Sequence, residues 1–163
     1  MPTFICQSRF SISREVLFSF HESELGFNTL VTNDTNVELI QKPKTLEIGE
    51  MAIIRVKIFP GFKPVWKSKH TGYQKNEFFE DTQIEGPFLK FIHKHKFLSN
   101  SDPNFPSILS DEIEYEFYPI PFSNWVILQM LSRMFLKRHD LTGKTLFAKQ
   151  ELIFCGYART IVD

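Results

Sequence analysis

The sequence predicts an α+β fold, in which a curved antiparallel sheet of about seven strands wraps around a long C-terminal helix. Two observations carry this prediction. Residues 37–119 read as one strand after another, and after Pro121 the pattern changes to a single long helix. Strands that are grouped together, with the helices kept apart from them, are typical of an α+β fold. A helix held by such a sheet can leave an apolar cavity between the two.

The first part of the chain predicts one strand followed by two short helices. Residues 3–12 alternate apolar and polar side chains at the period of a strand. Residues 13–23 follow with an apolar helical stripe, and Ser13 stands where a helix N-cap is expected. A second helical turn is expected at 23–31, and the run TNDTN at 32–36 is a turn signal.

Six further strands and the long helix complete the predicted order. The strands are expected at 37–41, 51–59, 65–74, 77–85, 88–97 and 107–120. Ser123 can cap a helix over 123–143, in which Gly143 ends the helix or marks a kink, with residues 144–153 continuing as helix. The sequence contains no repeat and no linker, so we expect residues 1–163 to form a single ligand-binding domain.

Composition excludes several classes of function. The formal net charge is zero, whereas a nucleic-acid-binding protein usually carries a basic excess. Neither Cys6 nor Cys155 belongs to a C-x-x-C pair, and no glycine-rich nucleotide motif is present, so we expect no cofactor. The chain begins without a signal-like apolar segment and has no membrane-length apolar run, which predicts a cytoplasmic protein without membrane insertion. The 18 phenylalanines indicate either a dense core or an apolar pocket.

The stretch FLKFIHKHKF, residues 88–97, indicates which face of the sheet points inward. In a strand, His93 and His95 share one face with two phenylalanines, while the lysines share the other face. The strand at 107–120 places Glu112, Glu114 and Glu116 on one face. If the two strands pair, lysines and glutamates meet on the outside. The two histidines must then point inward, toward the helix.

Other polar residues fall on the same inner face and leave three interpretations open. His70, Asp81, Gln83, Asp111 and Tyr115 belong to it by strand alternation. These side chains could satisfy one another in a rigid core, or orient the polar end of a ligand in an apolar pocket. They could also serve metal binding or acid–base chemistry, but a His-x-His pair with one carboxylate is a weak motif, and we expect no metal. We expect the remaining two histidines, His21 and His139, to lie on the surface at helix ends.

The sequence resembles the START-like, or SRPBCC, superfamily of helix-grip proteins, and within it a ligand-binding, polyketide cyclase/dehydrase-like subgroup. The resemblance covers the whole chain and is carried by SREVLFSFHE (13–22), FEDTQIEGPF (79–88), the H-x-H pair with the following phenylalanine (93–97), DEIEYEFYP (111–119) and RMFLKRH (133–139). Phe91 stands where the family usually has tryptophan. The resemblance implies a sheet that grips the C-terminal helix around a deep apolar cavity. Relatives bind lipids, sterols or polyketides, and some catalyse cyclisation or dehydration, but no catalytic set can be carried over.

We therefore expect a protein that binds a small hydrophobic molecule in an internal cavity, as a monomer or homodimer. The candidate cavity-lining residues are Trp66, His70, Phe79, Asp81, Gln83, Phe91, His93, His95, Asp111, Tyr115, Phe117, Met130 and Met134. One alternative is a cyclase- or dehydratase-type enzyme that uses the histidines and aspartates for acid–base catalysis. Another is a protein-interaction module with a filled interior.

Overall fold

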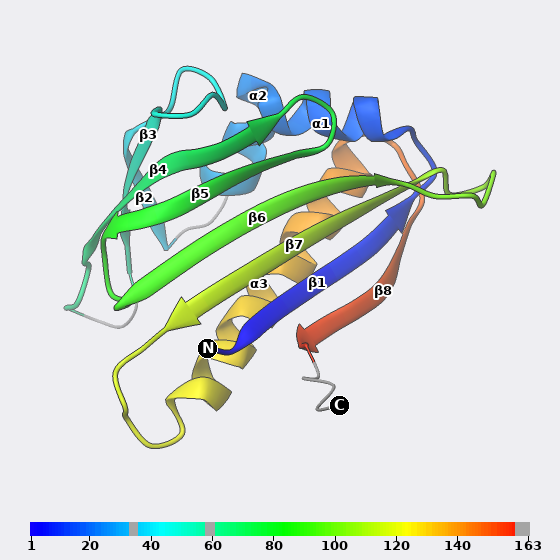
Figure 1. The fold of residues 1–163 in the computed structure, drawn as a ribbon. Helices are drawn as coiled ribbons and strands as arrows, with labels where there is room; N and C mark the ends of the chain where they lie inside the picture. The colour runs from blue at the N-terminus through cyan, green and yellow to red at the C-terminus, as the bar shows by residue number, and fades with distance from the viewer. Residues whose placement is uncertain (33–35, 58–60, 159–163) are drawn as a thin grey trace.

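The computed structural model describes residues 1–32, 36–57 and 61–158, which form one antiparallel sheet and a small number of helices. The sheet has eight strands in the order β2-β3-β4-β5-β6-β7-β1-β8 (Figure 1). The strands are β1 (Thr3–Phe10), β2 (Val37–Gln41), β3 (Met51–Val56), β4 (Val65–Gln74), β5 (Phe78–Glu85), β6 (Lys90–Ser99), β7 (Ser107–Glu116) and β8 (Gln150–Tyr157).

The helices lie at one end of the sheet and behind it. The first helices are α1 (Arg14–Glu22) and α2 (Glu24–Phe27), followed by a π-helical turn η1 (Asn28–Thr32). Ser13 caps α1 as predicted, because its hydroxyl accepts a hydrogen bond from the backbone of Val16. The long helix α3 (Ser123–Thr145) runs behind β6, β7 and β1 (Figure 1). The α+β prediction is confirmed. The turn predicted at 32–36 and the end of the strand predicted at 51–59 fall partly outside the described residues.

The C-terminal region differs from the prediction. Residues 144–153 were expected to continue the helix, but α3 ends at Thr145 and β8 begins at Gln150. Phe147 adopts a left-handed backbone conformation, with φ of 50°, which a helix cannot continue through. Strand β8 then pairs with β1, which would otherwise be an open edge of the sheet. The predicted cap of α3 was also wrong, because Phe122 occupies that position, with φ of 62°, and no side chain caps the helix.

The pairing of β6 with β7 confirms the predicted inner and outer faces. Lys94 lies directly opposite Glu112, and Lys90 lies opposite Glu116. The ammonium of Lys96 also lies 2.6 Å from the carboxylate of Glu112. These charges share the outer face, so the alternate residues of β6, including both histidines, point toward α3.

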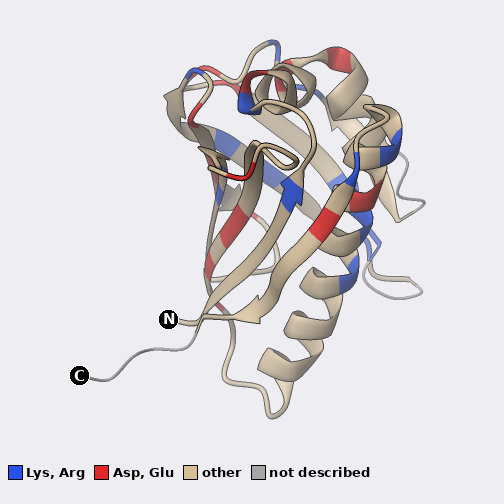
Figure 2. Cartoon of the chain, turned by 90° about the vertical axis from the view of Figure 1, so that its right-hand side faces the viewer, with Lys and Arg blue, Asp and Glu red and all other residues tan. Residues whose placement is uncertain are grey.

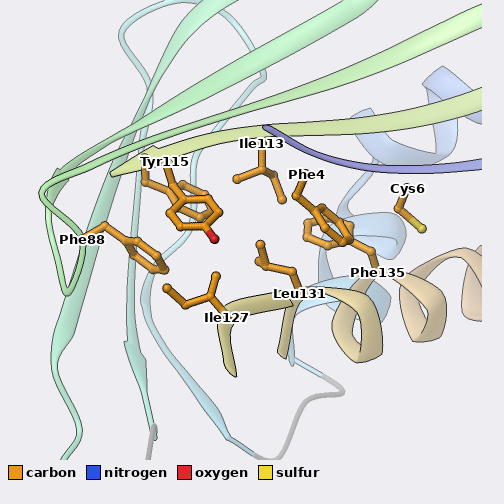
Figure 3. Close-up of a cluster of buried hydrophobic side chains, with 9 residues drawn as sticks. Phe4, Cys6, Phe88, Ile113, Tyr115, Ile127, Leu131 and Phe135 are labelled. Atoms are coloured by element: carbon orange, nitrogen blue, oxygen red, sulfur yellow. The ribbon is translucent and has the colours of Figure 1, made fainter. Parts of the chain in front are cut away.

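Two apolar clusters hold the sheet to the helices. In the first, Phe4, Ile113 and Tyr115 of the sheet lie above Ile127, Leu131 and Phe135 of α3 (Figure 3). The second cluster joins α1 to the other end of the sheet and contains Phe10, Leu17, Phe18, Leu46, Phe79, Phe97 and Leu109. Many of the phenylalanines therefore belong to a dense core. Among the described residues, no helix combines the length and the apolar character needed to span a membrane.

Candidate functional site

A polar cluster lies between the two apolar clusters, on the inner face of the sheet. It consists of Asp81 of β5, His93 and His95 of β6, Asp111 of β7 and His139 of α3, and we call it the inner cluster. The register explains its position: Asp81 is directly opposite His93, and His95 is directly opposite Asp111. Directly paired residues in an antiparallel sheet point to the same face, so strand pairing alone brings four of the five side chains together.

Asp111 is the centre of the inner cluster. Its side chain is buried, and its two oxygens face three imidazoles. Oδ2 accepts a hydrogen bond from His139 Nε2 at 2.7 Å, and Oδ1 accepts one from His93 Nε2 at 2.9 Å. His95 Nδ1 is 2.6 Å from the same Oδ1, although its direction does not satisfy hydrogen-bond geometry. One carboxylate thus positions imidazoles from both the sheet and the helix.

The charges in the inner cluster follow from burial and from these contacts. Burial alone would raise the pKa of Asp111, but His95 and the hydrogen bonds from His139 and His93 outweigh it and hold that pKa well below its ordinary value. Burial, reinforced by the neighbouring His93, holds the pKa of His95 well below its ordinary value. Near neutral pH the centre is therefore an ionised Asp111 beside an uncharged His95.

Asp81 faces the same histidines from the opposite side. Its Oδ2 lies 3.6 Å from His93 Nδ1 and 3.8 Å from His95 Nε2, both longer than a hydrogen bond. Burial raises the pKa of Asp81, while His93, His70 and Arg138 of α3 act in the opposite direction. The Asp81 carboxylate therefore lies in a largely buried space beside two ring nitrogens to which it is not hydrogen-bonded.

The prediction that His139 and His21 lie on the surface was wrong. His139 is completely buried, and its Nδ1 lies 2.8 Å from the hydroxyl of Ser8. Its position could have been found from the sequence, because Ile127, Leu131, Phe135 and His139 recur every four residues along one helix face. His21, in the last turn of α1, is also buried, and burial lowers its pKa to about 4.

Four of the predicted aromatic residues, Trp66, Phe91, Tyr115 and Phe117, form a separate group nearer the N-terminal end of α3. Trp66 is half-buried and packs edge-on against Phe91, with ring centres 4.8 Å apart. The Tyr115 hydroxyl contacts that of Tyr157. Phe117 packs against Phe88, which was not among the candidates. Trp125 of α3 does not belong to this group, because it is 64% exposed.

The remaining candidates divide between the inner cluster, the helix and a structural role. His70 is buried and directly opposite Asp81, and its Nδ1 has no hydrogen-bond partner among the described residues. Phe79 stacks on His95 with ring centres 4.1 Å apart. Gln83 instead holds the turn after β5, because its amide donates to the Phe88 carbonyl at 2.8 Å. Met134 packs against the first apolar cluster, and Met130 is partly exposed.

The two cysteines lie next to the inner cluster. Cys6 of β1 is directly opposite Cys155 of β8, and both are free thiols. The hydrogen bond from Cys6, helped by Ser132 of α3, lowers the pKa of Cys155 to about 7. The pKa of Cys6 is raised by its hydrogen bond with Cys155 and by burial.

We expect the two thiols to differ in reactivity. Because the pKa of Cys155 is about 7, iodoacetamide should alkylate Cys155 at neutral pH, with a rate that falls about tenfold per pH unit below that pKa. Cys6 should stay unmodified in the folded protein, because it is buried and its pKa is raised. Peptide mass spectrometry after timed labelling measures both rates, and Cys155→Ser is the control. Equal labelling of the two cysteines would contradict the expectation.

Comparison with solved structures identifies the fold. Protein CV1439 from Chromobacterium violaceum superposes with a TM-score of 0.62 at 13% identity, covering 88% of this chain and 95% of that chain. The di-domain ARO/CYC StfQ from the steffimycin biosynthetic pathway gives 0.66 at 9% identity, covering 86% of this chain and 48% of that chain. Ara h 8.0201 gives 0.62 at 14% identity, covering 89% of this chain and 97% of that chain.

These similarities confirm the helix-grip fold that the resemblance to the START-like superfamily implied. At such low identities they show the fold and leave the function open. No family model matches the sequence, and no curated protein matches it.

Proposed function

We propose that the chain is a single ligand-binding domain that binds a small hydrophobic molecule, lipid- or polyketide-like, between the sheet and α3. The observation that carries this proposal is an apolar inner surface that is incompletely covered. The inner-face residues of β2 and β3 are apolar yet only half-buried: Val37, Leu39, Ala52, Ile54 and Val56. In a filled core such side chains would be fully buried.

The register establishes that these residues face inward. Ile54 lies directly opposite Trp66, and Trp66 packs on the buried rings of Phe88 and Phe91. The apolar surface of β2 and β3 is therefore continuous with the aromatic group. It lies two to three strands from the inner cluster, so a molecule with an apolar body and one polar end would match both.

The helix presents a matching apolar flank. Its first ten residues, 123–132, carry no charge, and the N-terminal end of α3 is tan in Figure 2. Ser132 faces Cys155 of β8. Met130, about 200° from Ser132 around the helix, therefore faces away from β8, with Met134 one turn further on. Flexible methionine side chains adapt well to apolar ligands. The structures of an ARO/CYC protein and of Ara h 8.0201 share the fold, and this supports a binding role by analogy.

The proposal is tested with a fluorescent apolar probe and two adjacent substitutions. We expect 1-anilinonaphthalene-8-sulfonate to bind the folded protein, and Ile54→Gln to weaken its binding by about tenfold because the change removes apolar contact area. Ile53 is the matched control, because it is equally half-buried but points to the opposite face, beside Lys67. Ile53→Gln should leave the affinity unchanged. Equal effects of the two substitutions, or no probe binding, would instead favour a filled interior.

A further inference from the structure

Three donor atoms of the inner cluster converge on one point. They are His93 Nδ1, His95 Nε2 and Asp81 Oδ2, and all three lie within 4.8 Å of one another. We propose that these side chains bind a divalent transition-metal ion, such as Zn²⁺ or Fe²⁺. The sequence pattern alone had led us to expect no metal, and the proposal goes beyond hydrophobic ligand binding.

The first argument is the direction of the lone pairs. Asp111 engages each imidazole through the nitrogen that is remote from Asp81: Nε2 of His93 at 2.9 Å and Nδ1 of His95 at 2.6 Å. A neutral imidazole with its proton on the nitrogen near Asp111 carries a lone pair on the other nitrogen. Both lone pairs then point toward the Asp81 carboxylate. When Asp81 is ionised, the three facing electron pairs repel one another, and a cation between them turns this repulsion into attraction.

The second argument is distance. Zinc binds imidazole nitrogen at ~2.0–2.1 Å and carboxylate oxygen at ~2.0–2.2 Å, so tetrahedral ligand atoms are separated by ~3.4 Å. The observed separations from Asp81 Oδ2 are 3.6 Å to His93 and 3.8 Å to His95. The atoms are too far apart to hydrogen-bond and slightly too far apart to coordinate. Small side-chain rotations would bring them to coordination distance.

The third argument is the orienting carboxylate. Histidine ligands commonly donate their second nitrogen to a carboxylate, which sets the tautomer and the ring direction. Asp111 accepts such a bond from His93 at 2.9 Å, lies 2.6 Å from Nδ1 of His95, and is itself held by His139 of α3 at 2.7 Å. Phe79 stacks on the His95 ring, and Phe135 packs edge-on against the His93 ring, so both rings are fixed. The donor atoms are therefore pre-positioned before any ion binds.

The donor set indicates the class of metal. Two imidazoles and one carboxylate suit zinc, iron, cobalt or nickel, whereas Mg²⁺ and Ca²⁺ prefer oxygen ligands only. The charges also permit a cation, because Asp81 and Asp111 together offer two carboxylates. Arg138 of α3 is close enough to lower the pKa of Asp81, and its positive charge would compete with a bound cation.

The test uses cobalt(II) as a spectroscopic probe on the full chain after treatment with a chelator. We expect one Co²⁺ per chain, with visible absorption bands of a low-symmetry nitrogen–oxygen site that Zn²⁺ abolishes by displacement. Asp81→Asn and His95→Gln should each weaken binding at least about tenfold, and Asp111→Asn about 10- to 100-fold. Circular dichroism verifies that each variant is folded, and Asp81→Asn changes the shape of the side chain least.

The matched control is His21→Gln, because His21 is another buried histidine whose ring centre lies 6.3 Å from that of His95. It should keep the wild-type affinity. A sulfur-to-cobalt charge-transfer band would place the ion at Cys6 and Cys155 and overturn the proposal. So would an absence of stoichiometric Co²⁺ binding, or an affinity that Asp81→Asn leaves unchanged. The fluorescent probe tests the apolar surface around Ile54, and the Co²⁺ titration tests the inner cluster. Failure of the metal proposal can therefore be told apart from failure of the ligand-binding proposal.

Discussion

Replacing Asp111 with alanine should destabilise the protein by about 3–5 kcal/mol, the cost typical of removing one partner from a buried charged network. The carboxylate accepts hydrogen bonds from His139 at 2.7 Å and from His93 at 2.9 Å. Without it, two buried N–H groups lose their acceptor, and each such loss costs about 1–3 kcal/mol. Urea unfolding followed by circular dichroism measures the difference in the free energy of unfolding.

The control for Asp111 is its neighbour Glu112, which points to the outer face and pairs with Lys96. An ion pair on the surface contributes about 0–1 kcal/mol, so Glu112→Ala should cost little. A double-mutant cycle with His139→Ala should give a coupling energy of about 1.5–3 kcal/mol, the range for a hydrogen bond to a charged group. A loss as small as that of Glu112→Ala would mean that Asp111 does not organise the inner cluster.

Phe135→Ala should be comparably destabilising, by about 3–5 kcal/mol, because it removes a large side chain from a packed interior. Phe135 projects from α3 into the core and is completely buried against the sheet. Its ring lies 5.9 Å from that of Phe4 and packs edge-on against His93 at 5.0 Å. The substitution therefore creates a cavity between the apolar core and the inner cluster. Thermal and urea unfolding measure the loss.

Phe147 provides the control for Phe135, because its side chain is 98% exposed. Phe147→Ala removes the same atoms from a site where they contact little, so the free energy of unfolding should change by less than about 0.5 kcal/mol. If Phe135→Ala costs no more than Phe147→Ala, the space between α3 and the sheet is not packed as the structure shows.

The inner faces of the strands were predictable because strand alternation is local. Lysines and glutamates that alternate on β6 and β7 can only be accommodated on the outside, so His93, His95 and Asp111 had to point inward. The helical repeat of α3 is equally local, and His139 could have been assigned to the buried face because it lies four residues after Phe135. It was missed because cationic residues flank it, a pattern that also marks an exposed helix end.

Residue periodicity within single elements was enough to predict the α+β class, the chain order of the first seven strands and the inward direction of the two histidines. Tertiary structure alone decided the rest. The strand β8 forms because β1 offers it a free edge, which no local pattern reveals. The donor atoms of His93, His95 and Asp81 face one another because of the register between the strands. Their direction also depends on Asp111, whose carboxylate contacts both imidazole rings. Register and side-chain direction are set by pairing and packing across the fold, so the donor geometry is visible only in three dimensions.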